Sequence, residues 1–211
     1  MLRKEGVRDS IQIHFYSPAP ITLPAAGPEI SQKILSLINS ENIIFHDSCK
    51  IKSIEKNKLI FQNGEVYFDL LLAVPPHIAP KVIYESGLAK EGEFIPINRD
   101  CKTHFENVYA VGDVTTLTII DTMTAPKAGV FAEGEAITVA KNIVFQIQSK
   151  KEFLLYDGKG GCFIETGRDT ASIIEVDMFS ESRPITKLTE STSKHLDEKL
   201  QFEKERLSKW L

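Results

Sequence analysis

The stretch THFENVYAVGD, residues 103–113, decides the fold. Its apolar centre, Val108 to Val111, predicts a strand that is buried on both faces, as central parallel strands are. Gly112 allows a sharp exit from this strand, since glycine has no side chain to obstruct a ligand. Asp113 then offers a carboxylate that can accept hydrogen bonds from a polyol. The stretch therefore predicts a ligand site at the carboxyl end of a parallel strand, although an isolated Gly-Asp more often caps a turn.

Other strands and helices are predicted on both sides of this stretch. LLLAV, residues 70–74, predicts a second central parallel strand, and the two prolines at 75 and 76 end it. Pro126 introduces a helix whose apolar residues continue to Ile143. Residues 162–165 and 172–176 predict two strands joined by a turn at Gly167. Earlier in the chain, strands are predicted at 11–16 and 43–45, an amphipathic helix at 29–40, and β structure with an Asn63-Gly64 turn at 50–74.

The chain ends in an amphipathic helix. Its apolar residues fall on one face, namely Leu196, Leu200, Leu207, Trp210 and Leu211. This stripe predicts packing on its own domain or on a second subunit, as in a homodimer; the alternative is docking on a membrane face near a quinone entry. Because strands alternate with helices along the chain, the predicted fold class is α/β.

Composition excludes several classes of protein. The 211 residues carry a formal charge of −4, and the basic residues are dispersed, so a nucleic-acid partner is disfavoured. The three cysteines form no CxxC, which suits a reducing compartment. No apolar run approaches the roughly 20 residues of a membrane span, and the start has no secretory apolar region. We therefore expect a cytoplasmic protein, either free or peripheral on the membrane face.

The spacing within residues 103–113 resembles the second FAD fingerprint of the pyridine nucleotide-disulfide oxidoreductases. In that family the aspartate hydrogen-bonds the ribityl chain of FAD, so the resemblance assigns this role to Asp113, with Gly112 beside it. The likeness continues in APKAGVFAEG, residues 125–134, which family members place against the pyrimidine edge of the flavin. It adds four cofactor-binding residues: Pro126, Lys127, Ala128 and Gly129.

Physical chemistry agrees with this placement. Free amides at a helix N-terminus and their partial positive charge favour an anion, and a reduced flavin carries negative charge near N1 and O2. Lys127 either adds positive charge there or is simply solvated. The cofactors implied are FAD in the complete protein and, at a second site of the family, NAD(P).

Residues 67–77 with 85–88 resemble the segment that returns the chain from the nicotinamide domain to the FAD domain. Residues 156–162 and the closing helix resemble the sulfide:quinone oxidoreductase branch. The resemblance implies partial doubly wound, Rossmann-like sheets with a C-terminal β-plus-helix appendage. The predicted ranges are the later part of a nicotinamide-type domain at 1–95, the later part of an FAD domain at 96–148, and an interface or membrane-facing appendage at 149–211.

Both glycine fingerprints of the family are missing. A GxGxxG turn should join a strand to a helix, but the glycine cluster at 158–161 leads into a strand-like stretch. In the family both fingerprints would precede residue 1. We therefore expect a fragment, a separately made domain or one half of a split protein, whose partner is an N-terminal half that carries the fingerprints. Alone, the chain should be inactive and bind FAD poorly.

The cysteines weaken a direct sulfide-oxidase assignment. In sulfide:quinone oxidoreductases a catalytic cysteine follows the Lys-x-Gly element, and matching that element places Ala136 at its position. Cys162 is the remaining catalytic candidate because its glycine-rich approach could expose it. A buried, inert role is favoured for it nevertheless, as it is for Cys49 and Cys101.

The function predicted for the complete enzyme is electron transfer between a small donor, FAD and an acceptor such as a quinone. One alternative is an NADH:quinone oxidoreductase-like flavoenzyme of the same superfamily. Another is a non-catalytic assembly module that keeps the fold without the cofactor.

Overall fold

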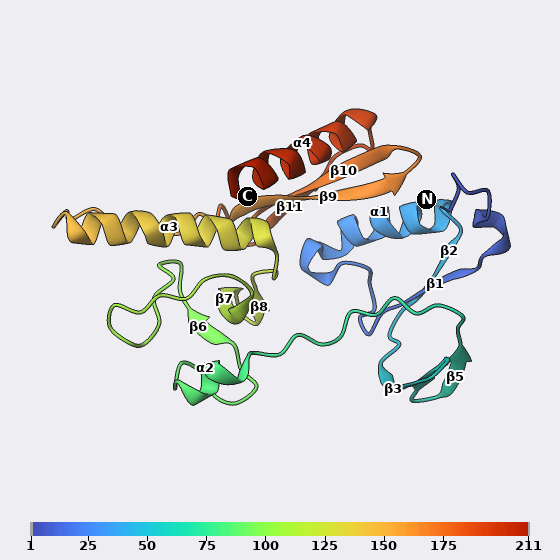
Figure 1. Ribbon diagram of the computed structural model, residues 1–211, viewed down its shortest axis with the longest axis horizontal. Helices are drawn as coiled ribbons and strands as arrows, with labels where there is room; N and C mark the ends of the chain where they lie inside the picture. The colour runs from blue at the N-terminus through green and yellow to red at the C-terminus, as the bar shows by residue number, and fades with distance from the viewer. Residues whose placement is uncertain (1, 211) are drawn as a thin grey trace. The chain divides into compact units, whose positions relative to one another are not determined.

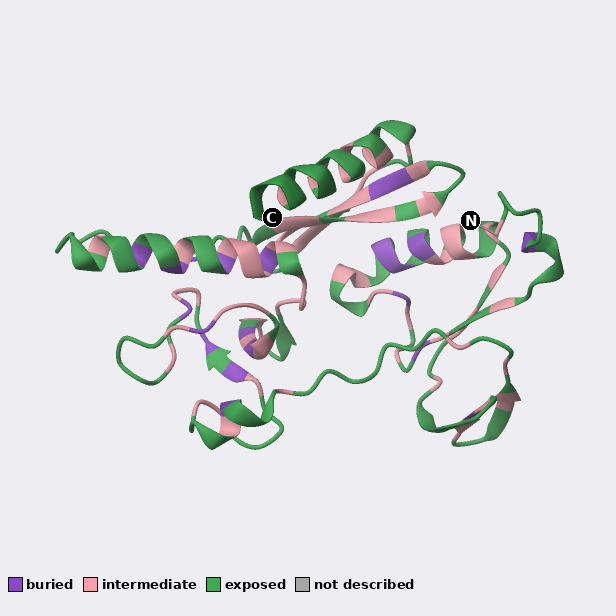
Figure 2. Cartoon of the chain, in the orientation of Figure 1, coloured by how far each residue is buried: buried purple, intermediate pink, exposed green. Residues whose placement is uncertain are grey.

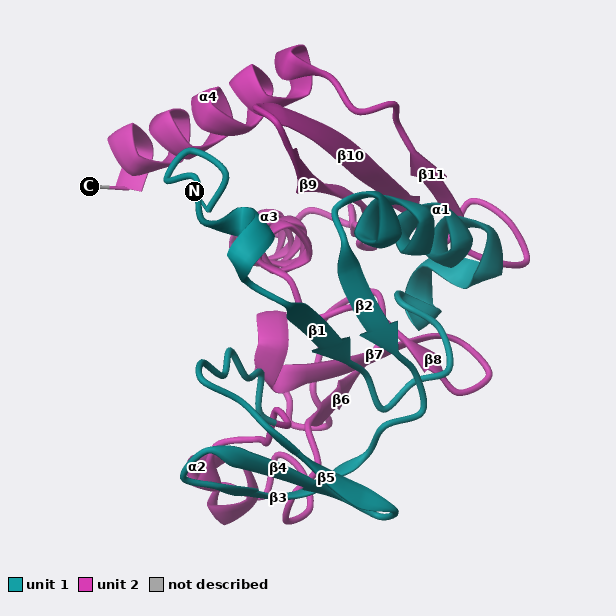
Figure 3. Cartoon of the chain, turned by 90° about the vertical axis from the view of Figure 1, so that its right-hand side faces the viewer, with its two compact units in different colours: residues 1–75 teal, residues 76–211 magenta. Residues whose placement is uncertain are grey.

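The computed structural model describes residues 2–210. The chain forms two compact units, residues 1–75 and residues 76–211, each with its own internal contacts (Figure 3). The fold is α/β, as predicted, with several small sheets. The division by contacts does not test which segments belong to a nicotinamide or an FAD domain, so the ranges 1–95, 96–148 and 149–211 stay predictions.

The first unit contains a parallel strand pair and a small meander. Strands β1 (Ile13–Tyr16) and β2 (Ile43–His46) pair in parallel, and helix α1 (Gly27–Ser40) connects them. Helix α1 begins with a proline in its first turn and buries Ile30 and Ile34. The predicted β structure forms an antiparallel meander of β3 (Ile51–Glu55), β4 (Lys58–Phe61) and β5 (Gly64–Tyr67). Two short 3-10 helices, η1 (Arg8–Ser10) and η2 (Pro24–Ala26), complete the unit.

The predicted strand at 70–74 is wrong for this chain. These residues belong to no strand, and the segment after β5 is mostly exposed (Figure 2). Leu72 is 89% exposed. Among the backbone hydrogen bonds outside helices and strands, no amide between Phe68 and Ile83 acts as a donor in the described chain. An apolar run becomes a central strand only when neighbouring strands satisfy its backbone, and no strand of the described chain takes that place.

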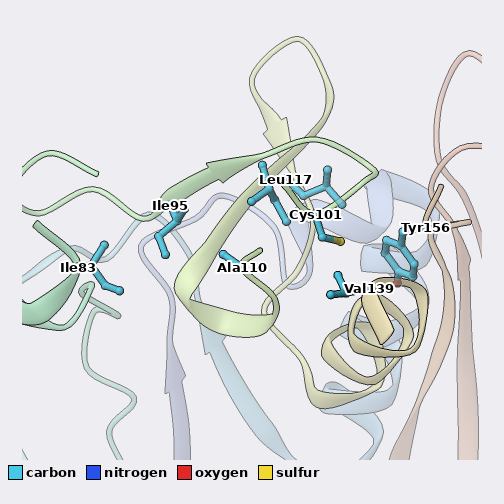
Figure 4. Close-up of a cluster of buried hydrophobic side chains, with 8 residues drawn as sticks. Ile83, Ile95, Cys101, Ala110, Leu117, Val139 and Tyr156 are labelled. Carbon is cyan, nitrogen blue, oxygen red and sulfur yellow. The ribbon is translucent and has the colours of Figure 1, made fainter. Parts of the chain in front are cut away.

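The second unit is built around helix α3 (Gly129–Ile147). A small sheet joins β6 (Ile95–Ile97) in parallel to β7 (Thr115–Ile120), which pairs antiparallel with β8 (Met123–Thr124). Helix α2 (Lys81–Glu85) and the 3-10 turn η3 (Gly112–Val114) lie in the connections. The buried core of this unit draws on α2, β6, β7, α3 and the segments that connect them (Figure 4): Ile83, Ile95, Ile97, Cys101, Ala110, Leu117, Val139 and Tyr156.

The predicted strand at 108–111 is reduced to one bridge, between Lys102 and Tyr109. The Ala110 amide donates to the Cys101 carbonyl, so one edge of this extended segment is paired. No backbone bond of the Tyr109 or Val111 amide is found in the described chain outside helices and strands. The segment is extended as expected, but a central strand needs a paired strand on each of its two edges, and this segment is paired on one edge.

An antiparallel sheet and a helix close the chain, with the predicted turn at Gly167. Strands β9 (Lys159–Gly167), β10 (Thr170–Asp177) and β11 (Ile185–Leu188) form the sheet, and α4 (Ser193–Trp210) lies along one face of it (Figure 1). Phe202 of α4 meets Phe163 of β9 edge-on at 5.7 Å between ring centroids.

Packing of the predicted apolar stripe on its own domain is found in part, because α4 contacts β10 and β9 and Leu196 is half-buried. Leu200, Leu207 and Trp210 are all more than half exposed, and residue 211 lies outside the described residues. A second subunit or a membrane face stays a prediction for this stripe. Within residues 2–210, no helix is both long enough and apolar enough to cross a membrane.

Candidate functional site

The residues singled out at 112–113 and 126–128 come together around one small hollow. Its volume is about 10 Å³, close to the space of one water molecule, so it could hold only an edge of a larger ligand. The turn η3, the start of β7, the loop after β8 and the first two turns of α3 provide its lining: Gly112, Asp113, Thr115, Ala125, Pro126, Lys127, Ala128, Phe131, Ala132 and Glu135. Five of the six predicted cofactor-binding residues are among them. Gly129, the sixth, opens α3 but is not part of the lining.

Gly112 brings the turn close to the helix. Its φ of +78° is in the left-handed region, and an added Cβ would come within 3.2 Å of the Ala132 Cβ. The next residue, Asp113, is partly exposed. No hydrogen bond or ion pair of its carboxylate is found among the described residues, so both oxygens can accept from a ligand.

The start of α3, next to this hollow, has free donors. Ala128 precedes the helix in an extended conformation, and no side chain caps the helix. The Phe131 and Ala132 amides donate to the Ala128 carbonyl, whereas the Gly129 and Val130 amides have no acceptor among the described residues. Free amides with the positive end of a 19-residue helix favour an anionic ligand edge.

Lys127 is committed to the protein rather than to solvent. Its Nζ donates to the carbonyl oxygens of Asp113 at 2.6 Å and Thr115 at 2.7 Å. The same ammonium lies 3.6 Å from the centre of the Phe94 ring, a cation–π contact. Burial lowers the pKa of Lys127, while the charges of Asp113 and Glu135 act in the opposite direction. The lysine thus ties the η3 turn to the loop before α3 and brings a positive charge to the hollow.

Glu135 was not predicted from the sequence. It is only 3% exposed, and its Oε2 accepts a hydrogen bond from the Gly112 amide at 2.6 Å. Burial raises its pKa, as does the charge of Asp113, while the Gly112 hydrogen bond and Lys127 act in the opposite direction. A signal was present in the sequence, because Phe131, Glu135 and Val139 recur at four-residue spacing and all are buried. A carboxylate within an apolar helical stripe needs a specific partner.

A second, larger hollow lies in the same unit. It has a volume of about 540 Å³ and a mostly apolar lining. Sheet residues of β9 to β11 line it together with Phe202 of α4 and Val130 of the first turn of α3. Four charged side chains stand among the apolar ones, Lys159, Glu175, Asp177 and Lys187. Val130 follows directly after the free amide of Gly129, so the two hollows approach the same helix start.

The cysteines divide into a buried and an exposed kind. The favoured buried role of Cys162 is wrong, because its side chain is exposed on β9 opposite Ile174. Partial loss of solvent around the sulfur still raises the pKa of the Cys162 thiol, which disfavours the thiolate at neutral pH. Cys101 is fully buried, and burial together with Glu135 and Asp100 raises its pKa to about 12, as expected of an inert core residue. Cys49 is half-buried.

Solved structures resemble nearly the whole chain. The sulfide:quinone oxidoreductase from the hyperthermophilic bacterium Aquifex aeolicus matches 99% of this chain at 25% identity, with a TM-score of 0.84. The match covers 52% of that protein, so the chain spans about half its length. A ferredoxin reductase from Rhodopseudomonas palustris matches 82% of the chain and 43% of its own length at 17% identity, with a TM-score of 0.59, which supports the fold alone.

Sequence comparison points the same way. The coenzyme A disulfide reductase of Staphylococcus aureus strain JH9 is 30% identical over 91 residues, which are 42% of this chain and 21% of that protein. The model of the pyridine nucleotide-disulphide oxidoreductases matches residues 10–136, which is more than half of the chain and includes both the η3 turn and the start of α3. The chain therefore belongs to the pyridine nucleotide-disulphide oxidoreductase family.

Proposed function

We propose that this chain is the flavin-edge half of an FAD-dependent oxidoreductase of the sulfide:quinone oxidoreductase-like type. One observation carries the proposal: the Asp113 carboxylate lines the small hollow, the Gly129 and Val130 amides directly follow its lining residue Ala128, and none of these groups has a partner among the described residues. Acceptor and donors left unsatisfied at one place fit a ligand that has both hydroxyl groups and an electron-rich edge.

The residues present fit FAD, which when bound would supply the electron transfer. Asp113 would accept a hydrogen bond from a ribityl hydroxyl. The Gly129 and Val130 amides would donate to the pyrimidine edge, and the helix end with Lys127 would favour negative charge there. Gly112 keeps the turn free of a side chain, so a cofactor can approach its backbone.

The larger hollow supports a quinone as the electron acceptor. Its volume of about 540 Å³ lies within the usual range for small-molecule sites, and its apolar lining suits an aromatic head group. It includes Val130, whose amide we assign to the flavin edge, so an acceptor there would lie close to the cofactor. Cys162 is exposed on β9, one of the strands that line this hollow. We propose it as the cysteine that would react with a sulfur-containing electron donor, since Ala136 occupies the position where the family has its catalytic cysteine.

The complete enzyme needs a second half. We propose that the glycine fingerprints for FAD and for NAD(P) lie on an N-terminal half, and that this chain alone is inactive. The chain spans about half of the sulfide:quinone oxidoreductase that it resembles, which fits this division. The proposal places the enzyme in the cytoplasm or on a membrane face, where a quinone is available.

The test is FAD affinity of the complete protein with Asp113→Ala. Losing a charged hydrogen-bond acceptor should weaken FAD binding roughly ten- to a hundredfold. Asp197→Ala is the matched control, because Asp197 is an exposed residue of α4 outside both hollows and should leave affinity unchanged. Unchanged affinity in Asp113→Ala, or no flavin at all in the complete protein, would refute the proposal; the second result would favour a non-catalytic assembly module.

A further inference from the structure

Glu135 is a buried carboxylate of α3 that lines the small hollow and contacts the η3 turn. It lines the small hollow, is only 3% exposed and accepts from the Gly112 amide at 2.6 Å. Burying a carboxylate costs free energy unless it is hydrogen-bonded or paired. The apolar residues at the same helical spacing, Phe131 and Val139, show that packing alone would be served by an aliphatic side chain. The presence of a carboxylate at this buried position therefore needs a reason other than packing, namely the hydrogen bond that it accepts.

Glu135 holds the first amide of the η3 turn, that of Gly112. The Gly112 carbonyl accepts from Thr115 Oγ1 at 2.8 Å, and the Asp113 and Thr115 carbonyls accept from Lys127. These bonds restrain only acceptors of the turn. Because Val111 precedes the turn in an extended conformation, the Gly112 amide has no helical acceptor, and Glu135 provides it from α3.

Other charged and titratable groups face Glu135 from several elements. Asp113 and Lys127 interact with it electrostatically from the turn and from the loop before α3. Cys101 and Tyr156 do so from the core. The Tyr156 ring packs against Gly134, where an added Cβ would lie 2.7 Å from the ring. Its buried hydroxyl has no hydrogen-bond partner among the described residues. Among residues 2–210, Gly112 is the residue found hydrogen-bonded to the Glu135 carboxylate, so the turn is its structural target.

We propose that Glu135 is a positioning residue: its carboxyl group anchors the Gly112 amide and thereby holds the Asp113 carboxylate toward the ligand. This inference rests on the proposed function for the identity of the ligand, but the anchoring itself belongs to the free chain. Either protonation state of the carboxyl can accept from the amide, and the ionised state binds it more strongly. The strength of the anchor should therefore follow the ionisation of Glu135.

The experiment is nuclear magnetic resonance of the isotope-labelled 211-residue chain, with the Gly112 and Asp113 amides followed through a pH titration. In the wild type, the Gly112 amide proton should shift in one step, with a midpoint above the ordinary 4.5 of a glutamate. Glu135→Gln should abolish this step and keep the signals of the turn, because an amide oxygen can still accept. Glu133→Gln is the matched control on the same helix, since Glu133 binds Arg206 and should leave the Gly112 step in place.

Glu135→Ala removes the acceptor. The Gly112 amide should then exchange with solvent roughly ten- to a hundredfold faster, and the Asp113 signals should move. A Gly112 shift that does not respond to pH in the wild type, or that still titrates in Glu135→Gln, would overturn the proposal. An unchanged Gly112 exchange rate in folded Glu135→Ala would do the same. Since no flavin is needed, the Asp113→Ala affinity test can fail without affecting this result.

Discussion

Two apolar stretches of this chain look alike in sequence and differ completely in structure. LLLAV at 70–74 is exposed except for half-buried Leu71 and belongs to no sheet, whereas the stretch that ends in Gly112 and Asp113 is held between core residues and α3. The difference is the location of their partners. The 112–135 region finds its hydrogen-bond partners inside the chain, in Glu135 and Lys127. The amides of residues 70–74 find no backbone acceptor within the described residues 2–210, and we propose that their partners lie on the half that carries the glycine fingerprints.

Hydrogen exchange should give the largest contrast between the two regions. Amides of residues 70–74 have no acceptor in the described chain and should exchange almost as fast as in an unfolded peptide. Amides in the middle of α3, around Val139 and Asn142, are buried and should exchange roughly a thousandfold more slowly. Mass spectrometry of the chain after deuterium labelling measures both. Slow exchange at 70–74 in the isolated chain would contradict the comparison, and slowing only after the N-terminal half is added would sharpen it.

A matched pair of leucines tests the same contrast by stability. Leu117 is 2% exposed in the core of the second unit, and Leu72 is 89% exposed. Leu117→Ala leaves a cavity and should lower the free energy of unfolding by about 2–5 kcal/mol. Leu72→Ala should change it by about 0.5 kcal/mol or less. Urea titration followed by circular dichroism measures both variants, and equal losses would show that residues 70–74 are packed after all.

These two regions also show how far the sequence could predict the structure. Local signals were sufficient for the α1 helix, the Asn63-Gly64 turn, the β9–β10 hairpin and the start of α3, because each depends on residues close in sequence. The predictions of strands at 70–74 and 108–111 were not confirmed, because a strand forms only when segments distant in sequence pair with it, and hydrophobic periodicity does not reveal such pairing. The resemblance singled out Gly112, Asp113 and residues 126–128, which the structure brings to one hollow, while their role in binding a cofactor stays a prediction. Glu135 was missed because its partner is 23 residues away in sequence.

Substitutions at two glycines of α3, Gly134 and Gly129, test how tightly this helix packs against Tyr156. A Cβ at Gly134 would lie 2.7 Å from the rigid Tyr156 ring, whereas a Cβ at Gly129 would meet nothing within 4 Å. Gly134→Ala should therefore destabilise the chain by about 1–3 kcal/mol through overpacking. Gly129→Ala should be neutral or stabilising by less than about 1 kcal/mol, since alanine favours a helix. Thermal unfolding measures both, and a neutral Gly134→Ala would mean that Tyr156 can move away from the site.

The smallest expected effect concerns the pH dependence of stability. The pKa of Glu135 is raised in the folded chain above its ordinary 4.5, so the folded state binds a proton more readily than the unfolded state. Its contribution is fully present below the unfolded pKa and is lost as pH rises through the folded pKa. Glu135→Gln carries no such proton, so its stability relative to the wild type should increase between about pH 4 and about pH 8. Urea unfolding at both values measures the difference. A parallel pH dependence in the two proteins would show that the Gly112 hydrogen bond and Lys127 fully offset the burial of the charge, and the region that keeps its partners inside the chain would then pay no electrostatic penalty for doing so.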